Sequence, residues 1–179
     1  MSPQEYDDYD PAKVAGNASL DAKARVARGY AIIAKKTSGF SAPIARRLHL
    51  VEVDVRGKAD EPSRQEARVV CETEVAEDML NIAGNMHGGC SAFLVDVCSS
   101  TPFAALSPEG AMGVSQAINM VYHAPARLGD KLKIVSTTIA VGARVMSARC
   151  EIWDTTNHRL VASGVHVKMD PSPPKTSKL

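Results

Sequence analysis

The sequence lacks a strong excess of charge of either sign. Its 21 Lys and Arg residues nearly balance its 20 Asp and Glu residues, which gives a formal net charge of +1. Such a chain creates no long-range field that would attract nucleic acid or an anionic membrane surface. An anionic ligand would therefore have to be bound by local cations.

The sequence also lacks the cysteine and histidine spacings of a metal site. Its four cysteines, Cys71, Cys90, Cys98 and Cys150, form no C-x-x-C pair and no cluster with zinc spacing. No metal is expected. The first residues are acidic and polar and do not resemble a signal peptide. These features predict a reducing compartment in which the cysteines are free, mostly buried thiols.

The length of 179 residues is enough for one domain and short for two, and no internal repeat is present. We predict a flexible acidic N-terminus over residues 1–18, one folded domain over 19–170, and an exposed tail over 171–179. The tail, with three prolines, is expected to be extended.

Hydrophobic periodicity predicts the order of the elements. An amphipathic helix is expected from Leu20 to Lys36, followed by strands near 48–55 and 67–75 that are joined by a polar hairpin loop. A helix that is apolar on every face follows over 90–106. Four strands are then predicted over 113–122, 131–141, 145–153 and 160–168, and their short links imply antiparallel pairing. One sheet wrapped around one apolar helix, an α+β fold, buries that helix most simply.

Pro102 lies inside the apolar helix and predicts a kink or the end of that helix near Thr101. A membrane span is the alternative interpretation of this segment. Its marginal length, its hydroxyl groups, Pro102 and Asp96 argue against a span.

Asp96 is the only charged residue between His87 and Glu109. Burying an unpaired carboxylate costs several kcal/mol, so Asp96 is either satisfied by structural partners or serves as a general base or nucleophile. The sequence His87-Gly88-Gly89 stands where the helix should begin. Free N–H groups at a helix N-terminus, with glycines that permit close approach, make a plausible oxyanion site.

His87 and Asp96 are nine positions apart, which is half a turn out of phase on an α-helix. They are therefore expected on opposite sides of the helix. Two antiparallel helices at a dimer interface could bring the helix N-terminus of one chain to the Asp96 of the other.

Three motifs together resemble the hotdog-fold thioesterases of the PaaI and THEM2 (acyl-CoA thioesterase 13) group. They are NIAGNMHGG at 81–89, Asp96 within the following helix, and GVSQAINMVYHAPARLGD at 113–130. The resemblance implies a single hotdog domain with an extra N-terminal helix. It also implies hydrolysis of acyl-CoA without a cofactor, since coenzyme A is part of the substrate, and a homodimer that pairs into a tetramer.

The resemblance further implies roles for individual residues. The Gly88 N–H would polarise the thioester carbonyl, and Asp96 of the partner subunit would activate water or attack directly. Ser115 would orient that water, while Asn81 and His87 would position the thioester and the Gly88 loop. Without the resemblance, Ser115 would be an ordinary strand serine and Asn81 a turn residue.

Contacts to the coenzyme A chain are implied for a second group of residues. The resemblance places them in two stretches and adds a separate lysine: Tyr122, His123, Ala124, Pro125 and Arg127; Gly142, Ala143 and Arg144; and Lys168. Family members often carry Lys or Arg directly after the glycine of the second stretch, where this chain has Ala143.

The other histidines, His49, His158 and His166, are interpreted as structural or surface residues. The acyl pocket is expected to be lined by Met86, Phe93, Leu94 and strands of the partner subunit. Two other functions stay open: a hotdog-fold enoyl-CoA hydratase or dehydratase, and a non-catalytic acyl-CoA-binding protein.

The last three residues, Ser177-Lys178-Leu179, match a peroxisomal targeting signal. They predict recognition by the peroxisomal import receptor and a location in the peroxisomal matrix after synthesis in the cytosol.

Overall fold

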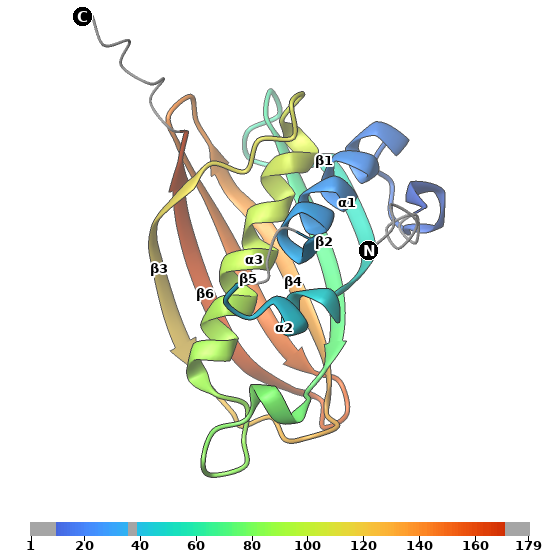
Figure 1. Ribbon diagram of the computed structural model, residues 1–179. Coiled ribbons are helices and arrows are strands. Elements are labelled where there is room, and N and C mark those ends of the chain that lie inside the picture. The colour runs from blue at the N-terminus through green and yellow to red at the C-terminus, as the bar shows by residue number, and fades with distance from the viewer. Residues whose placement is uncertain (1–9, 36–38, 171–179) are drawn as a thin grey trace, which may run out of the picture.

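The computed structural model describes residues 10–35 and 39–170, which form one antiparallel sheet around a central helix (Figure 1). The strands are β1 (His49–Gly57), β2 (Gln65–Glu74), β3 (Val114–Tyr122), β4 (Lys131–Val141), β5 (Val145–Asp154) and β6 (Arg159–Met169). The helices are α1 (Leu20–Lys35), α2 (Ala42–Arg46) and α3 (Gly88–Leu106), with short 3-10 turns η2 (Pro11–Lys13) and η3 (Glu77–Met79). The predicted α+β hotdog fold is confirmed.

The six strands lie in the order β1-β2-β4-β5-β6-β3. Every pairing is antiparallel, as the short links predict. However, β3 pairs with β6 and not with the strand that follows it. The connecting segment passes the N-terminal end of α3, where the Met86 N–H donates to the Ala126 carbonyl at 2.7 Å. This crossing leaves β3 at one edge of the sheet.

Helix α3 lies against the sheet, and α1 packs beside α3 on the same face of the sheet (Figure 1). Most of α3 is buried, including fully buried Leu94 and Val95. By length and composition α3 would be able to cross a membrane, but 72% of its apolar window is buried inside the protein. The structure thus accounts for this apolar segment as a core helix.

Pro102 does not end α3, so the predicted end near Thr101 is wrong. A proline has no N–H to donate to the carbonyl four residues earlier, which is that of Cys98. The Thr101 hydroxyl donates to the Cys98 carbonyl at 2.8 Å instead. The neighbouring side chain therefore replaces the missing hydrogen bond, and the helix continues to Leu106.

Residues 10–18, the last part of the predicted flexible segment, hydrogen-bond to β1. The N–H of Ala15 donates to the Val51 carbonyl at 2.9 Å, and the Val53 N–H donates to the Ala15 carbonyl at 3.0 Å. Gly16 has a φ of +93°, and a β-carbon there would lie 2.2 Å from the Val53 carbonyl oxygen. This segment therefore covers the outer edge of β1, a common protection for edge strands. Residues 1–9 and the predicted tail lie outside the described residues.

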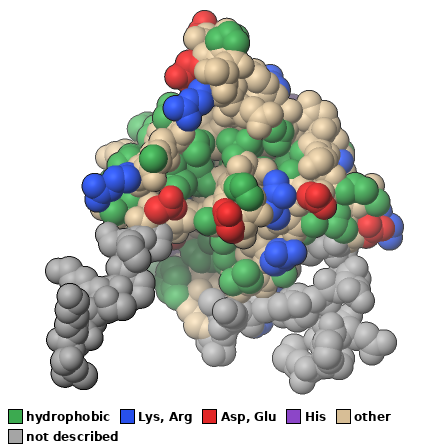
Figure 2. Space-filling view, turned by 90° about the horizontal axis from the view of Figure 1, so that it is seen from above, with side chains coloured by type: hydrophobic (Ala, Val, Ile, Leu, Met, Phe, Trp, Pro, Cys, Tyr) green, Lys and Arg blue, Asp and Glu red, His purple; other side chains and the backbone are tan. Residues whose placement is uncertain are grey.

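The end of the molecule that is seen from above carries cations and anions in alternation (Figure 2). No field of one sign covers this face, in agreement with the formal net charge of +1. On this face, an anionic group would meet individual cations and not a broad basic surface.

Candidate functional site

The N-terminus of α3 has one free backbone donor. His87 is the N-cap, and its Nδ1 accepts a hydrogen bond from the Gly89 N–H at 2.8 Å. The Cys90 N–H donates to the His87 carbonyl at 2.8 Å. Within the described residues, the Gly88 N–H has no hydrogen-bond partner. A free N–H at this position is what an oxyanion site requires.

The loop before α3 is held by Asn81, whose side-chain oxygen accepts from the N–H groups of Ala83 at 2.9 Å and Asn85 at 3.2 Å. The Asn81 N–H in turn donates to the Asn85 carbonyl at 2.8 Å. Asn81 therefore closes a tight loop that fixes the approach to His87. These contacts use the Asn81 oxygen, and its amide NH₂ makes no hydrogen bond within the described part of the chain.

Tyr122, the last residue of β3, lies over Gly88. Its hydroxyl donates to the Gly88 carbonyl at 3.1 Å, and its ring would be 3.4 Å from a β-carbon at Gly88. A β-carbon at position 88 would therefore be in van der Waals contact with the Tyr122 ring, whereas glycine leaves this space beside the helix N-terminus open.

A second polar group lies further along α3 and contains Asp96. The Ser115 hydroxyl of β3 donates to Asp96 Oδ1 at 3.2 Å. His166 Nε2 of β6 lies 2.9 Å from Ser115 Oγ and 3.6 Å from Asp96 Oδ1. A β-bulge between Ser115 and Ala117 shifts the register of β3 at this point, and bulges commonly re-aim a side chain at a functional site.

Asp96 differs from the sequence prediction in its burial. Its side chain is 46% exposed, although the helix was predicted to be buried on every face. The reason is that the sheet and α1 leave a strip of α3 beside β3 uncovered in a single chain.

The predicted geometry between His87 and Asp96 also needs correction. His87 has extended backbone angles as the N-cap, so helical phase does not apply to it. Gly88 and Asp96 are instead separated along the helix, by eight positions or about 12 Å of rise. Within one chain these two groups cannot contact the same thioester.

Two residues of β6 are buried beside Asp96. Lys168, which was predicted to contact coenzyme A, is only 4% exposed, and its ammonium donates to Ser100 Oγ at 2.8 Å. His166, which was interpreted as a structural or surface residue, is fully buried against Ser115 and Asp96, so the surface interpretation does not hold. The alternation of side chains along β6 could have predicted this burial, because it places both residues on the face of the strand that carries buried Ala162.

The predicted acyl-pocket residues are not equivalent. Leu94 is fully buried in the core and Met86 is nearly so, which makes both unsuitable as walls of an open pocket in a single chain. Phe93 is partly exposed and packs edge-on against Phe40, with ring centroids 5.8 Å apart.

Cys90, in the first turn of α3, is not a suitable nucleophile. Burial and, to a smaller extent, the nearby Asp78 raise the pKa of its thiol to about 11. At neutral pH the group is therefore a neutral thiol. Among the described residues, no cluster of three His, Cys, Asp or Glu side chains is arranged to hold a metal ion.

The predicted coenzyme A contacts lie at two ends of the molecule. Tyr122, His123, Pro125 and Arg127 are exposed beside the N-terminus of α3, with Ala124 between them. Gly142, Ala143 and Arg144 form the exposed hairpin after β4. The two stretches are separated by the whole length of β4, or about 35 Å.

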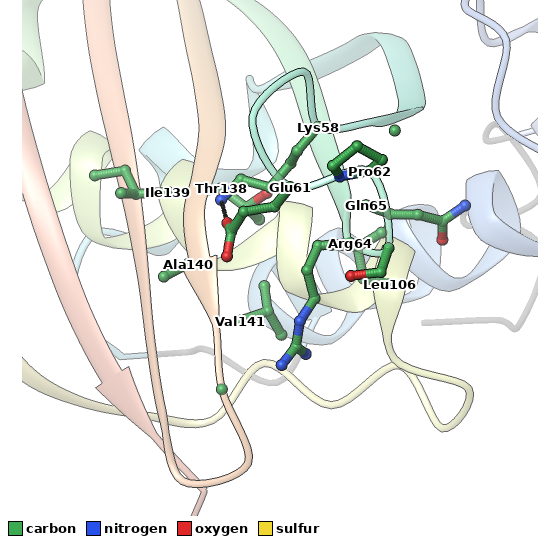
Figure 3. Close-up of a pocket in the computed structure, with 13 residues that line it drawn as sticks. Lys58, Glu61, Pro62, Arg64, Gln65, Leu106, Thr138, Ile139, Ala140 and Val141 are labelled. Carbon is green, nitrogen blue, oxygen red and sulfur yellow. Dashed lines mark hydrogen bonds and ion pairs between the residues drawn. The ribbon is translucent and has the colours of Figure 1, made fainter.

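An open cavity of about 730 Å³ lies between the β1–β2 hairpin and the β4–β5 hairpin (Figure 3). Lys58, Glu61 and Arg64 line it together with Gly142, and Leu106 closes one side. Because Leu106 is the last residue of α3, the cavity lies at the opposite end of the helix from Gly88. It contains Gly142 from the predicted coenzyme A contacts and none of the predicted catalytic residues.

Comparisons with known proteins agree with this architecture. Residues 83–161 match the family model described as thioesterase superfamily. Human acyl-coenzyme A thioesterase 13 is 35% identical over 115 residues, which are 64% of this chain and 81% of the human protein. The crystal structure of zebrafish thioesterase superfamily member 2 superposes with a TM-score of 0.65 at 26% identity, covering 80% of this chain and 94% of that chain.

A further solved structure is similar over a shorter range. It is a hypothetical thioesterase from Streptococcus pneumoniae with coenzyme A, with a TM-score of 0.54 at 25% identity, covering 59% of this chain and 79% of that one. Together, the fold, the polar groups on α3 and the extent of these matches show that the chain belongs to the thioesterase superfamily.

Proposed function

We propose that the protein hydrolyses acyl-CoA thioesters to the free acid and coenzyme A. The relatives named acyl-coenzyme A thioesterase support this substrate class, as does the thioesterase structure with coenzyme A. The observation that carries the proposal is the hydrogen-bonded pair of Asp96 and Ser115, which lies on the uncovered strip of α3. A half-exposed carboxylate with an ordered hydroxyl beside it is suited to hold and deprotonate water.

In the proposed reaction, water attacks the thioester carbonyl carbon while Asp96 accepts its proton. The Gly88 N–H stabilises the negative charge that develops on the carbonyl oxygen. The tetrahedral intermediate then collapses, the carbon–sulfur bond breaks, and the sulfur leaves with the proton that Asp96 had taken up. The alternative role of Asp96, direct attack on the carbonyl, uses the same residues and gives the same products.

The site is proposed to form between two chains. Gly88 and Asp96 are about 12 Å apart along the helix axis of one chain, too far for one carbonyl to meet both. The N-terminal segment covers the β1 edge of the sheet, whereas the outer edge of β3 has no partner strand among the described residues. Pairing of two copies along β3 supplies a partner, buries exposed Val114 and Val121 at this edge, and brings the α3 helices of the two copies together.

The same arrangement accounts for the two stretches predicted to contact coenzyme A. The Tyr122–Arg127 stretch of one chain and the Gly142–Arg144 hairpin of its partner would face one ligand. Within one chain these stretches are at opposite ends of β4.

The test is hydrolysis by purified protein of a panel of fatty acyl-CoA and aryl-acetyl-CoA substrates, with thiol release as the readout. Asp96→Asn keeps the shape and the Ser115 contact but removes the base, so kcat should fall by about 100-fold or more. Asp60→Asn, in the exposed β1–β2 loop, is the matched control and should be fully active.

The stability of the Asp96→Asn variant should change little, because the side chain is half-exposed. Normal turnover in this variant would exclude the proposed role of Asp96. Binding of acyl-CoA without hydrolysis by the wild-type protein would favour a non-catalytic binding protein. Addition of water to an enoyl-CoA would favour a hydratase.

A further inference from the structure

Lys168 and His166 form an unusual pair behind Ser115. Both side chains point from β6 toward α3 and are buried, and Lys168 carries a charge with only 4% exposure. Burying an ammonium group is costly unless its hydrogen bonds are satisfied. No ion pair compensates Lys168 in the described part of the chain. Its ammonium instead donates to Ser100 Oγ at 2.8 Å and to Ser115 Oγ at 3.4 Å.

The two serines that Lys168 contacts each have one proton to donate, and the acceptors are identifiable. Ser100 donates to the Asp96 carbonyl at 2.7 Å, so its oxygen accepts from Lys168. Ser115 Oγ is near Asp96 Oδ1 and near His166 Nε2. An ionised carboxylate only accepts hydrogen bonds, whereas a neutral imidazole nitrogen can either accept or donate.

The protonation of His166 decides the direction of these bonds. Burial and, to a smaller extent, the nearby Lys168 lower the pKa of His166 to about 4, so the ring is neutral at physiological pH and carries one N–H. If that N–H is on Nε2, it donates to Ser115, and Nδ1 accepts from the Ser99 hydroxyl at 2.7 Å. In the opposite tautomer, Nε2 would accept the Ser115 proton. Ser115 Oγ and Asp96 Oδ1 would then lie in contact with no hydrogen between them.

With the first tautomer, the hydrogen bonds of Ser115 and of both His166 ring nitrogens are satisfied. Ser115 Oγ accepts from His166 Nε2 and from Lys168, which occupies both of its lone pairs, and its single proton is directed to Asp96 Oδ1. Asp96 Oδ2 has no donor among the described residues. It is therefore the oxygen that faces the water in the proposed reaction.

From this hydrogen-bond geometry we propose that Lys168 and His166 are positioning residues that direct the Ser115 proton to Asp96 and thereby fix the orientation of its carboxylate. They act through Ser115 and do not touch the substrate. The proposal rests on the proposed thioesterase function. It adds two residues on β6, one of them a buried charge, to the groups needed for turnover.

The kinetic test compares Lys168→Met with Lys131→Met. Methionine keeps the apolar stem of the lysine and removes the ammonium group with its donors and charge. Lys131 is an exposed lysine at the start of β4. Lys168→Met should lower kcat by about tenfold or more while KM changes less than about twofold, as for residues that orient a reacting group through another side chain. Lys131→Met should match the wild type.

His166→Gln and His166→Leu test the second residue. Glutamine keeps an N–H that can reach Ser115, so it should retain more activity than leucine. If the role of His166 were merely structural, the loss of activity in both variants would instead parallel their loss of thermal stability. Melting curves and size-exclusion profiles establish that each variant folds and assembles, and Lys168→Met should be at least as stable as the wild type because a buried charge is removed.

A measurement that does not depend on activity tests the assigned proton directly. The chain contains five histidines, and with ¹⁵N-labelled histidine the imidazole nitrogens of His166 can be assigned by comparison with His166→Gln. The expected spectrum shows a protonated Nε2 and an unprotonated Nδ1 at neutral pH. A protonated Nδ1 would overturn the proposal.

The outcomes separate the two proposals. If the wild type hydrolyses acyl-CoA and Asp96→Asn does not, but Lys168→Met and His166→Leu turn over normally, the positioning role is refuted and the thioesterase function stands. If the wild type hydrolyses no acyl-CoA, both fail.

Discussion

Acidification should destabilise the protein through His166. The ordinary pKa of the residue is 6.5, and burial together with the nearby Lys168 lowers it to about 4 in the folded chain, with Asp96 partly opposing the shift. Between these two values the unfolded chain binds a proton on His166 and the folded chain does not. The free energy of unfolding therefore falls as the pH falls from 6.5 toward 4.

The size of this effect follows from the shift. A displacement of the pKa from 6.5 to about 4, at 1.36 kcal/mol for each pH unit, corresponds to roughly 3 kcal/mol of stability lost at pH 4. For a domain of this size the loss corresponds to a decrease in Tm of roughly 6 to 12 °C. Because His166 is fully buried, solvent screening does not reduce this loss of stability substantially.

Carboxylates also titrate in this range, so the informative quantity is a difference between variants. Urea unfolding, followed by circular dichroism at one fixed protein concentration, would be measured at several pH values from 7 to 4. His166→Gln should be less stable at pH 7 and should lose roughly 3 kcal/mol less than the wild type on acidification. His49→Gln removes an exposed histidine and is the control. Parallel pH profiles for the wild type and His166→Gln would refute the reasoning.

Three other predictions concern assembly, the core and location. A heterodimer of Asp96→Asn with Gly88→Val, isolated through two affinity tags, should recover about half of the wild-type activity per dimer, because one of its sites is free of both changes; no recovery in a correctly assembled species would exclude a site shared between chains. Thr101→Val removes the donor to the Cys98 carbonyl beside Pro102 and should cost about 1 to 3 kcal/mol in urea unfolding, whereas an unchanged midpoint would show that the carbonyl needs no such donor. A fluorescent protein fused ahead of this chain, with its end free, should enter peroxisomal puncta and become diffuse when Leu179 is deleted; a diffuse signal from the intact fusion would contradict the targeting prediction.

The fold could be predicted well because its signals are local. Alternation along β4 and β5 places every second side chain in the core, and the structure shows this pattern over residues 131–138 of β4 and over Val145–Asp154. The apolar run at 90–106 similarly required burial on most of its faces. The pairing of β3 with β6 was not predictable in this way, because it depends on a crossing that periodicity does not encode.

The candidate site was predicted only in part because its remaining features depend on tertiary contacts. Gly88 and Asp96 could be singled out from residue type and position. The free N–H of Gly88 and the half-exposure of Asp96 are properties of the folded chain. His166 was missed because a histidine in a strand becomes informative only when the side chains facing it are known, and here these are Ser115, Ser99 and Asp96.

The position of Asp96 connects the proposed assembly with the proposed hydrogen-bond frame. Asp96 contacts Ser115 on β3, the strand whose outer edge is open, so pairing of two chains along β3 would reduce the exposure of this carboxylate below its present 46%. Lys168 and His166 lie within the same chain as Asp96 and are already buried behind Ser115 before a partner is present. They can therefore fix the orientation of the carboxylate while the second chain excludes solvent. For this reason we expect the loss of Lys168 or His166 to lower turnover more than it weakens assembly.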